Sequence, residues 1–381
     1  MEHTGKSWFD KWHKVLLLMP IVLMLASLAY IGMFYSKNGD FMYKDTTLSG
    51  GTTITLAGDN VPENFESLIK QKLPNINLRK LTDISTGKQI AVVVESMKQP
   101  QEFQSVVEEV LGYNLTEDNS SVEFTGPALS QSFYNELMKT VFVSFILMAI
   151  VIFIIFGESK LIKIVTLVLS LIAVKLTFQN QVFLSALIIL FSVAALIYVY
   201  SKSQKSKNDI VYIGIAVGAL IITTLFTNYV LIFPIAAILF AMYLINSVPS
   251  IAVIFAAFAD IIITLAVIDI MEVRLSAAGI AAFITLIGFS VDTDILLTTR
   301  AMKKGEGSLN QRIYKSFKTG MLMTFTSLGA LLPAFFIVSG LPESFRQIFL
   351  ILAIGLSADI LTTWLTNTGI IKIYCDKKGI K

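Results

Sequence analysis

Ten apolar stretches, most of them close to the length of a membrane-spanning helix, set the strongest limit on how this chain can fold. They cover residues 15–35, 137–156, 161–178, 182–200, 210–227, 229–246, 249–270, 277–298, 320–339 and 347–371. About 20 apolar residues in a helix cross the hydrocarbon core of a bilayer. The sequence therefore predicts a polytopic α-helical membrane protein with about ten spans.

Composition and charge agree with a membrane location. Charged residues are only 15% of the 381, whereas a soluble domain has about 25%. Lysines gather before the first stretch, in alternate loops and at the C-terminus. The positive-inside rule then predicts that both termini are cytoplasmic and that residues 1–35 form an amphipathic segment and the first span. The net charge of +3 is too small to indicate a nucleic-acid partner.

Several kinds of chemistry are excluded by the residue counts. Cys375 is the only cysteine, and the two histidines, His3 and His13, both precede the first apolar stretch. An intramolecular disulfide, a cysteine-built metal site and histidine catalysis within the membrane are therefore not expected. The chain also lacks a G-x-x-x-x-G-K-[ST] nucleotide-binding loop. We expect no enzyme activity, no cofactor and no metal ion.

The one long polar segment, residues 36–130, is expected on the extracytoplasmic side. Its patterns alternate between strands and helices in the order βαββαβ, with strands at 52–58, 75–84, 88–96 and 120–126 and helices at 62–73 and 99–112. This order predicts a small ferredoxin-like α+β domain.

Four acidic residues fall inside predicted spans: Asp260, Asp292, Asp294 and Asp359. An ionised carboxylate near the centre of a bilayer costs about 3 kcal/mol or more, so each must face protein or water, or carry a proton. One interpretation is a proton path; the other is a simple hydrogen bond to a neighbouring Ser or Thr. Asp292 and Asp294 should point to nearly opposite sides of their helix, since successive residues are about 100° apart.

Several segments together resemble one family. "IGFSVDTDILLTTRAMKKG" (287–305) resembles the signature of the archaeal SecF proteins, and "LSGGTTITL" (48–56) resembles the strand with which they enter their external domain. "GPALSQSFYNELMKTV" and "ADILTTWLTNTGI" are similar to the lead into the second span and the end of the last. Residues 131–159 and 247–381 would then form core spans, and 160–246 would be four inserted spans.

The resemblance implies a fold of the RND superfamily with six core spans and an external ferredoxin-like domain. It also implies partnership with SecD and the SecY/SecE channel, contact with a translocating polypeptide, and help to protein export driven by the proton motive force. The G-x-S-x-[ND] context assigns the proton relay to Asp292, with Asp294 as the alternative. Lys318 is the one candidate for the positive partner of the relay, and a weak one.

Alternatives to these assignments come from different classes of protein. A stand-alone proton-coupled transporter of small molecules would act without SecD, and a membrane aspartyl protease would pair two of the acids. We expect Gly50 and Gly51 to form a tight bend at the first strand. Small residues, namely Gly279, Ala281, Gly288 and Ser290, are expected to allow close helix packing. Lys175 is expected to extend to the outer membrane surface among lipid headgroups.

Overall fold

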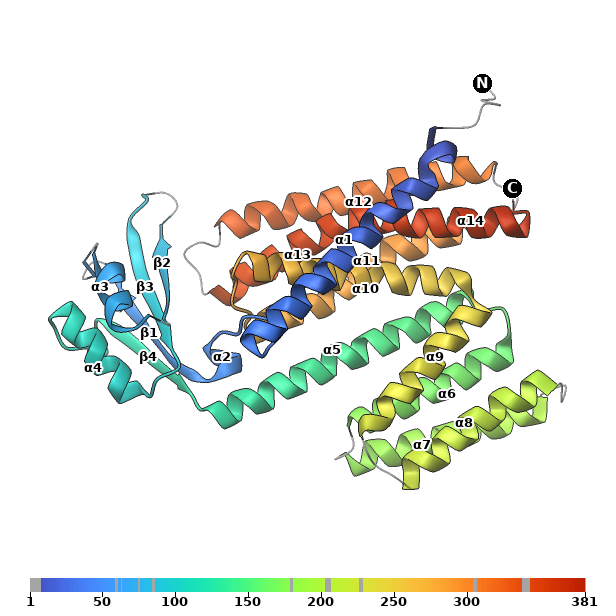
Figure 1. The fold of residues 1–381 in the computed structure, drawn as a ribbon, viewed down its shortest axis with the longest axis horizontal. Coiled ribbons are helices and arrows are strands. Elements are labelled where there is room, and N and C mark those ends of the chain that lie inside the picture. Colours follow the sequence, from blue (N-terminus) through green and yellow to red (C-terminus); the bar gives the residue numbers. More distant parts are fainter. Residues whose placement is uncertain are drawn as a thin grey trace.

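The protein consists of a long helical bundle with a small α/β domain at one end (Figure 1). The structure, a computed structural model, describes residues 8–58, 61–62, 64–74, 76–83, 86–178, 181–202, 207–225, 229–303, 307–337 and 343–380. Residues 1–7 of the expected amphipathic segment lie outside these ranges. Both ends of the drawn chain lie at the end of the bundle opposite to the α/β domain.

The α/β domain has the predicted ferredoxin-like topology. Its sheet is antiparallel throughout, with the strand order β2-β3-β1-β4. The elements are β1 (Gly51–Ala57), α3 (Phe65–Lys72), β2 (Asn77–Thr82), β3 (Gln89–Ser96), α4 (Pro100–Leu111) and β4 (Ser120–Thr125). The two helices pack on one face of the sheet, where Ile54, Phe65 and Phe103 form the centre of the core. Gly112 ends α4 in the left-handed conformation, as its position in the sequence predicts.

Two glycines fix the junction between this domain and the bundle. Gly50 and Gly51 have φ angles of 82° and 139°, which confirms the predicted bend. A Cβ atom on Gly50 would lie 2.8 Å from Cα of Pro127, and one on Gly51 would lie 2.4 Å from the carbonyl oxygen of Ser96. The chain thus enters the sheet beside the point where it leaves it for α5.

The short connection before this bend is also held by hydrogen bonds. Asp45 caps α2 (Thr46–Ser49), because its Oδ1 accepts from the amides of Thr47 and Leu48. Burial raises the pKa of the Asp45 carboxyl to about 6. Lys44 pairs with Leu275 as an isolated bridge, which ties the connection to the start of α11.

Within the described ranges, seven helices are long and apolar enough to cross a membrane. Six are the predicted core spans, and the seventh is α7. The core helices are α1 (Trp8–Asn38), α5 (Pro127–Phe156), α10 (Val248–Ile270), α11 (Ala277–Met302), α12 (Leu309–Ile337) and the continuous run of α13 (Glu343–Leu361), η4 (Thr362–Asn367) and α14 (Thr368–Lys378). The chain is therefore a multi-pass membrane protein.

The segment expected to hold four inserted spans forms four helices, α6 (Lys160–Thr177), α7 (Val182–Lys202), α8 (Lys207–Leu225) and α9 (Ile232–Asn246), with η2 (Tyr229–Leu231) before the last. The 15 residues of α9 extend only about 22 Å, and α6 carries three lysines. Of these four helices, α7 alone meets the length and hydropathy of a span.

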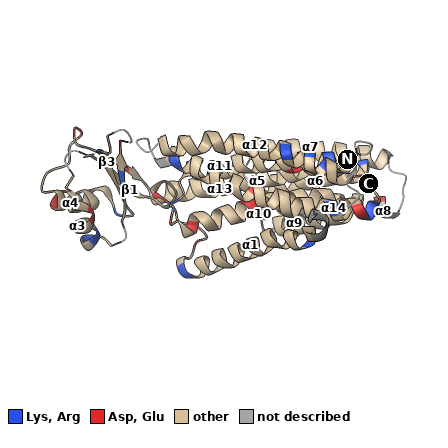
Figure 2. Ribbon diagram, turned by 90° about the horizontal axis from the view of Figure 1, so that it is seen from above, with Lys and Arg blue, Asp and Glu red and all other residues tan. Residues whose placement is uncertain are grey.

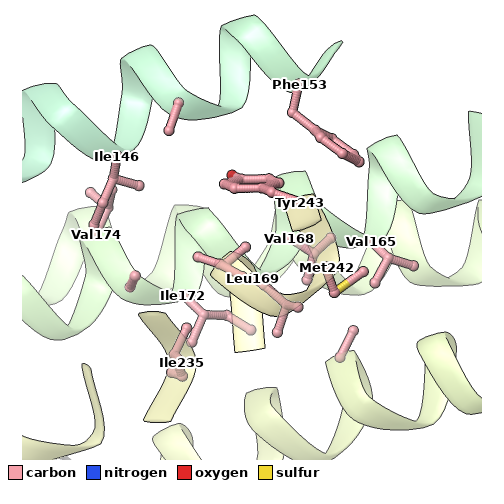
Figure 3. Packing of buried hydrophobic residues seen from close by; sticks show 14 of the residues in the cluster. Ile146, Phe153, Val165, Val168, Leu169, Ile172, Val174, Ile235, Met242 and Tyr243 are labelled. Carbon is pink, nitrogen blue, oxygen red and sulfur yellow. The ribbon is translucent and has the colours of Figure 1, made fainter. Parts of the chain in front are cut away.

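The helices α6 to α9 form a module beside α5 (Figure 1). Figure 3 shows the core that joins them, in which side chains of α5, α6 and α9 interlock. The rings of Phe153 and Tyr243 lie 4.8 Å apart at its centre. Lys175 does not extend to the surface as expected: it is 6% exposed, and its Nζ donates to the carbonyl oxygen of Thr223, 3.1 Å away, in the last turn of α8.

Charged residues lie mainly toward the two ends of the molecule. Figure 2 shows that most of the length of the bundle carries neither sign of charge. A polar group inside such a bundle must therefore find its hydrogen-bond partners among neighbouring helices.

Candidate functional site

Three of the four predicted acids converge inside the bundle from three different helices. Asp260 comes from α10, Asp294 from α11 and Asp359 from α13, and each side chain is fully buried at 0% exposure. These helices pack against one another along much of their length. We call Asp260, Asp294 and Asp359 the carboxyl cluster.

Asp260 receives two short hydrogen bonds. The Ser290 hydroxyl donates to its Oδ2 at 2.5 Å, and the Thr362 hydroxyl donates to its Oδ1, also at 2.5 Å. Distances of about 2.5–2.7 Å are typical of a hydroxyl that donates to an ionised carboxylate. Both Asp260 oxygens are thus supplied with donors, as an anion in a buried site requires.

Asp359 is linked to Asp294 through a single hydroxyl group. Thr363 Oγ1 lies 2.8 Å from Oδ1 of Asp294 and 2.9 Å from Oδ1 of Asp359. Thr293 Oγ1 lies 3.1 Å from Oδ2 of Asp359, but it lies closer, at 2.8 Å, to the carbonyl oxygen of Ser290. The two hydroxyls that contact Asp359 therefore each have a second acceptor.

Asp294 is bound by a side-chain amide as well. Nδ2 of Asn367 donates to Oδ1 of Asp294 at 2.7 Å. The other oxygen of each group, Oδ2 of Asp294 and Oδ1 of Asn367, is buried and accepts no hydrogen bond from a protein group.

A π-helical turn supplies most of these donors. Thr362, Thr363 and Asn367 all belong to η4, the six-residue π-helix between α13 and α14. Single π-helical turns inside α-helices occur frequently at functional sites, where they change the direction of the side chains that follow. Here the turn directs two neighbouring threonines to different acids, Thr362 to Asp260 and Thr363 to Asp294 and Asp359.

Glycines let the surrounding helices approach the cluster closely. A Cβ atom on Gly355 of α13 would lie 2.3 Å from a methyl carbon of Leu286 on α11. One on Gly320 of α12 would lie 2.3 Å from the ring of Trp364 in η4. The short separation of α13 from α11 explains how side chains as small as Thr293 and Asp359 can meet.

No positive charge compensates the three acids within the described part of the chain. The hydrogen bonds to their carboxyl oxygens come from hydroxyls and from the Asn367 amide, and none comes from Lys or Arg. Lys318, the predicted partner, is exposed on α12. Among the described residues, no group of three His, Cys, Asp or Glu side chains is placed to hold a metal ion.

Asp292 is not part of the carboxyl cluster. It is exposed on the outer face of α11, whereas Asp294 is buried, as the predicted opposite directions require. Of these two residues, only Asp294 faces the acids on α10 and α13.

The small residues of α11 fall into two groups. Gly279 lies against Gln347 and Ile351 of α13, and Ser290 is buried against Asp260, so both pack closely as expected. Gly288 and Ala281 are exposed, and a Cβ atom on Gly288 would have no neighbour within 4 Å. These two lie on the same outer face as Asp292 and do not pack against another helix of this chain in the described residues.

The sequence interpretation missed the donors to the cluster. Thr293, Thr362, Thr363 and Asn367 were not identified as site residues, although the last three lie in the quoted "ADILTTWLTNTGI". A signal was available, because so many hydroxyl and amide side chains in one span need polar partners on other helices.

With this geometry in place, comparison with known families gives a clear relationship. Residues 193–377 match the family described as "Protein export membrane protein SecD/SecF, C-terminal". The matched region contains the whole carboxyl cluster and all its donors. It begins within α7, and thus includes part of the segment expected to be an insertion.

Individual relatives point to one subunit. The protein-export membrane protein SecF of Methanothermobacter thermautotrophicus is 44% identical over 137 residues, which are 35% of this chain and 48% of that protein. SecF of Pyrococcus furiosus is 41% identical over 131 residues, 34% of this chain and 44% of that protein. These relatives are archaeal SecF proteins, and this chain is similar to them. The aligned part of this chain spans about half the length of the relatives it matches.

A solved structure shares the fold. The crystal structure of SecDF, a translocon-associated membrane protein from Thermus thermophilus, superposes with a TM-score of 0.50 at 12% identity. The alignment covers 98% of this chain and 39% of the SecDF chain. The likeness thus extends over both the helical bundle and the α/β domain.

Proposed function

We propose that this protein assists Sec-dependent protein export as the SecF subunit of a complex with SecD, and that proton movement through the carboxyl cluster drives this activity. The observation that carries the proposal is the set of three buried acids on α10, α11 and α13, joined by hydroxyls within the region that matches the SecD/SecF family. A merely structural hydrogen bond would need one acid, not three.

The hydrogen bonds of the cluster support proton binding. Thr363 has one hydroxyl hydrogen, yet its oxygen lies within 2.9 Å of carboxyl oxygens of both Asp294 and Asp359. It can donate fully to one of them, and the second contact is a hydrogen bond if that carboxyl carries a proton. Asp260, with two short donor bonds, suits the ionised state. Protons on Asp294 and Asp359 would lower the charge of the cluster from −3 to −1.

Proton passage supplies enough energy for a conformational change. One elementary charge that crosses the membrane gains about 2.3 kcal/mol per 100 mV, which shifts a two-state equilibrium by roughly fifty-fold. The acids lie on α10, α11 and α13 and their donors on α11 and η4, so a change of protonation alters the hydrogen bonds that connect these four elements. Lys44 and Leu275 join the start of α11 to the connection that leads into the α/β domain.

The arrangement in the cell follows from the same proposal. Both termini lie on the cytoplasmic side of the cell membrane, and the domain at residues 36–130 lies outside, where it assists a polypeptide that leaves the SecY/SecE channel. The positions of the termini and the α/β domain at opposite ends of the bundle support this orientation. The outer face of α11, with Asp292 and Gly288, is exposed in the single chain and suits a helix of the SecD partner.

A pull-down from native membranes tests the partnership. We expect the tagged protein, extracted in mild detergent, to co-purify with a SecD-like protein that mass spectrometry identifies. A homo-oligomer without a Sec component would refute the proposal in favour of a stand-alone transporter.

Export into inverted membrane vesicles tests the role of the cluster. We expect Asp294→Asn to abolish the part of export that depends on the proton motive force, while the complex with SecD still forms. Asp292→Asn is the comparison, because it makes the same chemical change on the opposite face of α11. An Asp294→Asn protein that keeps full proton-dependent export would contradict the assignment.

A further inference from the structure

Asp294 and Asn367 form one of the two hydrogen bonds that a carboxylic acid and an amide can share. One N–H···O bond of 2.7 Å joins the amide of Asn367 to Oδ1 of Asp294. The remaining oxygen of each planar group, Oδ2 of Asp294 and Oδ1 of Asn367, is buried without a hydrogen-bond donor. Both side chains are fully buried at 0% exposure, so neither oxygen can turn to bulk water.

Two unpaired acceptor oxygens next to each other are unfavourable in a buried site. Each unsatisfied buried polar atom destabilises the folded state, and a charged one does so more strongly. An amide oxygen can only accept, whereas a carboxyl oxygen can donate once it carries a proton. A single proton on Oδ2 of Asp294 would therefore satisfy both atoms, because it would donate to Oδ1 of Asn367.

We propose that Asn367 holds a proton on Oδ2 of Asp294 by forming a two-point acid–amide pair, in which the acid donates to the amide oxygen and the amide donates to the acid. This inference rests on the proposed function for its purpose, since it names the atom that stores the proton. Asn367 is a positioning residue in this scheme, and Asp294 is the proton carrier.

The groups around the pair leave no competing cation within the described ranges. The titratable side chains that face Asp294 are Asp260 on α10 and Asp359 on α13, and both are acids. From η4, Thr363 and Asn367 contact it, and neither ionises. A charged Asp294 would thus be opposed by its two acidic neighbours, whereas a protonated Asp294 completes the pair with Asn367.

Isosteric replacement tests the pair in the purified full-length chain without any export assay. Asp294→Asn places an N–H where the proton would be, so we expect this variant to fold and its unfolding temperature to fall less steeply with rising pH than that of wild type. Wild type should lose stability as the pH rises above about 4, where an unfolded aspartate gives up its proton but the folded one retains it. Asp294→Leu should unfold at a lower temperature than Asp294→Asn at every pH, because it leaves Asn367 unpaired.

Infrared spectroscopy on protein labelled with ¹³C-aspartate reads the proton directly. Of the protonated-carboxyl C=O bands at neutral pH, we expect one to be lost in Asp294→Asn, to shift in Asn367→Leu and to be unchanged in the control Asp292→Asn. An unshifted band in Asn367→Leu, or an Asp294→Asn protein that fails to fold, would overturn the inference.

Sodium chloride and choline chloride, compared at equal ionic strength, separate a proton from a metal cation. If sodium raises the unfolding temperature of wild type and not of Asp294→Asn, the two oxygens take a cation in place of the proton, and the acid–amide pair is refuted. Equal unfolding temperatures in the two salts are expected. Because each of these readouts uses the isolated chain, a failure here is distinct from a failure to co-purify with SecD.

Discussion

Replacing Thr362 by Val removes one of the two donors to Asp260 with almost no change in shape. The Thr362 hydroxyl lies 2.5 Å from Oδ1 of Asp260, and both residues are fully buried. A hydrogen bond to a charged group contributes about 1.5–3 kcal/mol, and its loss leaves a carboxylate oxygen unpaired. We therefore expect Thr362→Val to lower the free energy of unfolding by about 2–3 kcal/mol.

The matched control is Thr285→Val on α11. Thr285 is exposed, and its hydroxyl donates only to the carbonyl oxygen of Ala281 one turn earlier. The same chemical change there should alter the free energy of unfolding by less than about 0.5 kcal/mol. Both variants are measured by reversible unfolding in mixed micelles, with a denaturing detergent as the titrant.

A double variant extends the test. Ser290 provides the other short bond to Asp260, so each single variant leaves one donor in place. Ser290→Ala combined with Thr362→Val should cost more than the sum of the two, by at least about 1 kcal/mol, because residues in one hydrogen-bond network are not additive. If Thr362→Val costs no more than Thr285→Val, or if the two effects simply add, Asp260 is not the ionised centre of the network.

Three further changes test other parts of the structure. Gly51→Ala should lower the free energy of unfolding by about 1–3 kcal/mol, because the φ of 139° and the nearby Ser96 carbonyl oxygen exclude a Cβ atom. Gly112 has open space around it, so Gly112→Ala should cost about 1 kcal/mol in the same unfolding assay. The pKa of the Asp45 carboxyl is raised to about 6, so the folded form binds this proton more tightly than the unfolded form. Its contribution to stability should fall by up to about 3 kcal/mol as the pH rises from about 4 to about 6, and thermal unfolding of Asp45→Asn should show a slope that is smaller by this amount. Lys175→Met leaves the Thr223 carbonyl oxygen, in the last turn of α8, without the donor that Lys175 Nζ provides. We expect the amides of that turn to exchange hydrogen faster in Lys175→Met than in Lys175→Arg, and equal exchange in the two variants would contradict this role of Lys175.

The α/β domain could be predicted almost completely from local patterns. Alternating β-branched residues, Pro100 at the start of α4 and Gly112 at its end act over a few residues, and the structure places each element within a few residues of the prediction. The order βαββαβ then leaves few ways to arrange four strands. The strand order β2-β3-β1-β4 follows from that limit.

The inserted module shows where hydropathy alone was insufficient. Apolar composition correctly located α6, α8 and α9, but among the described residues of this module only α7 is long and apolar enough to be a candidate span. Lys175 was expected to reach the membrane surface because a lysine in an apolar helix usually does so. Its actual partner, the carbonyl of Thr223, lies 48 residues away in the sequence and could be found only from the packing of α6 against α8.

The sequence by itself determined that this chain spans a membrane, that it carries a ferredoxin-like domain, and that acids inside its spans need polar partners. Each of these follows from a local property: hydropathy, strand periodicity and the cost of a charge in lipid. Only the tertiary structure decided which acids lie together. Helical periodicity states that Asp292 and Asp294 point apart, but it does not state which of them faces α10 and α13. That choice depends on how α11 is rotated in the bundle, and on a π-helical turn that brings Thr363 and Asn367 to Asp294.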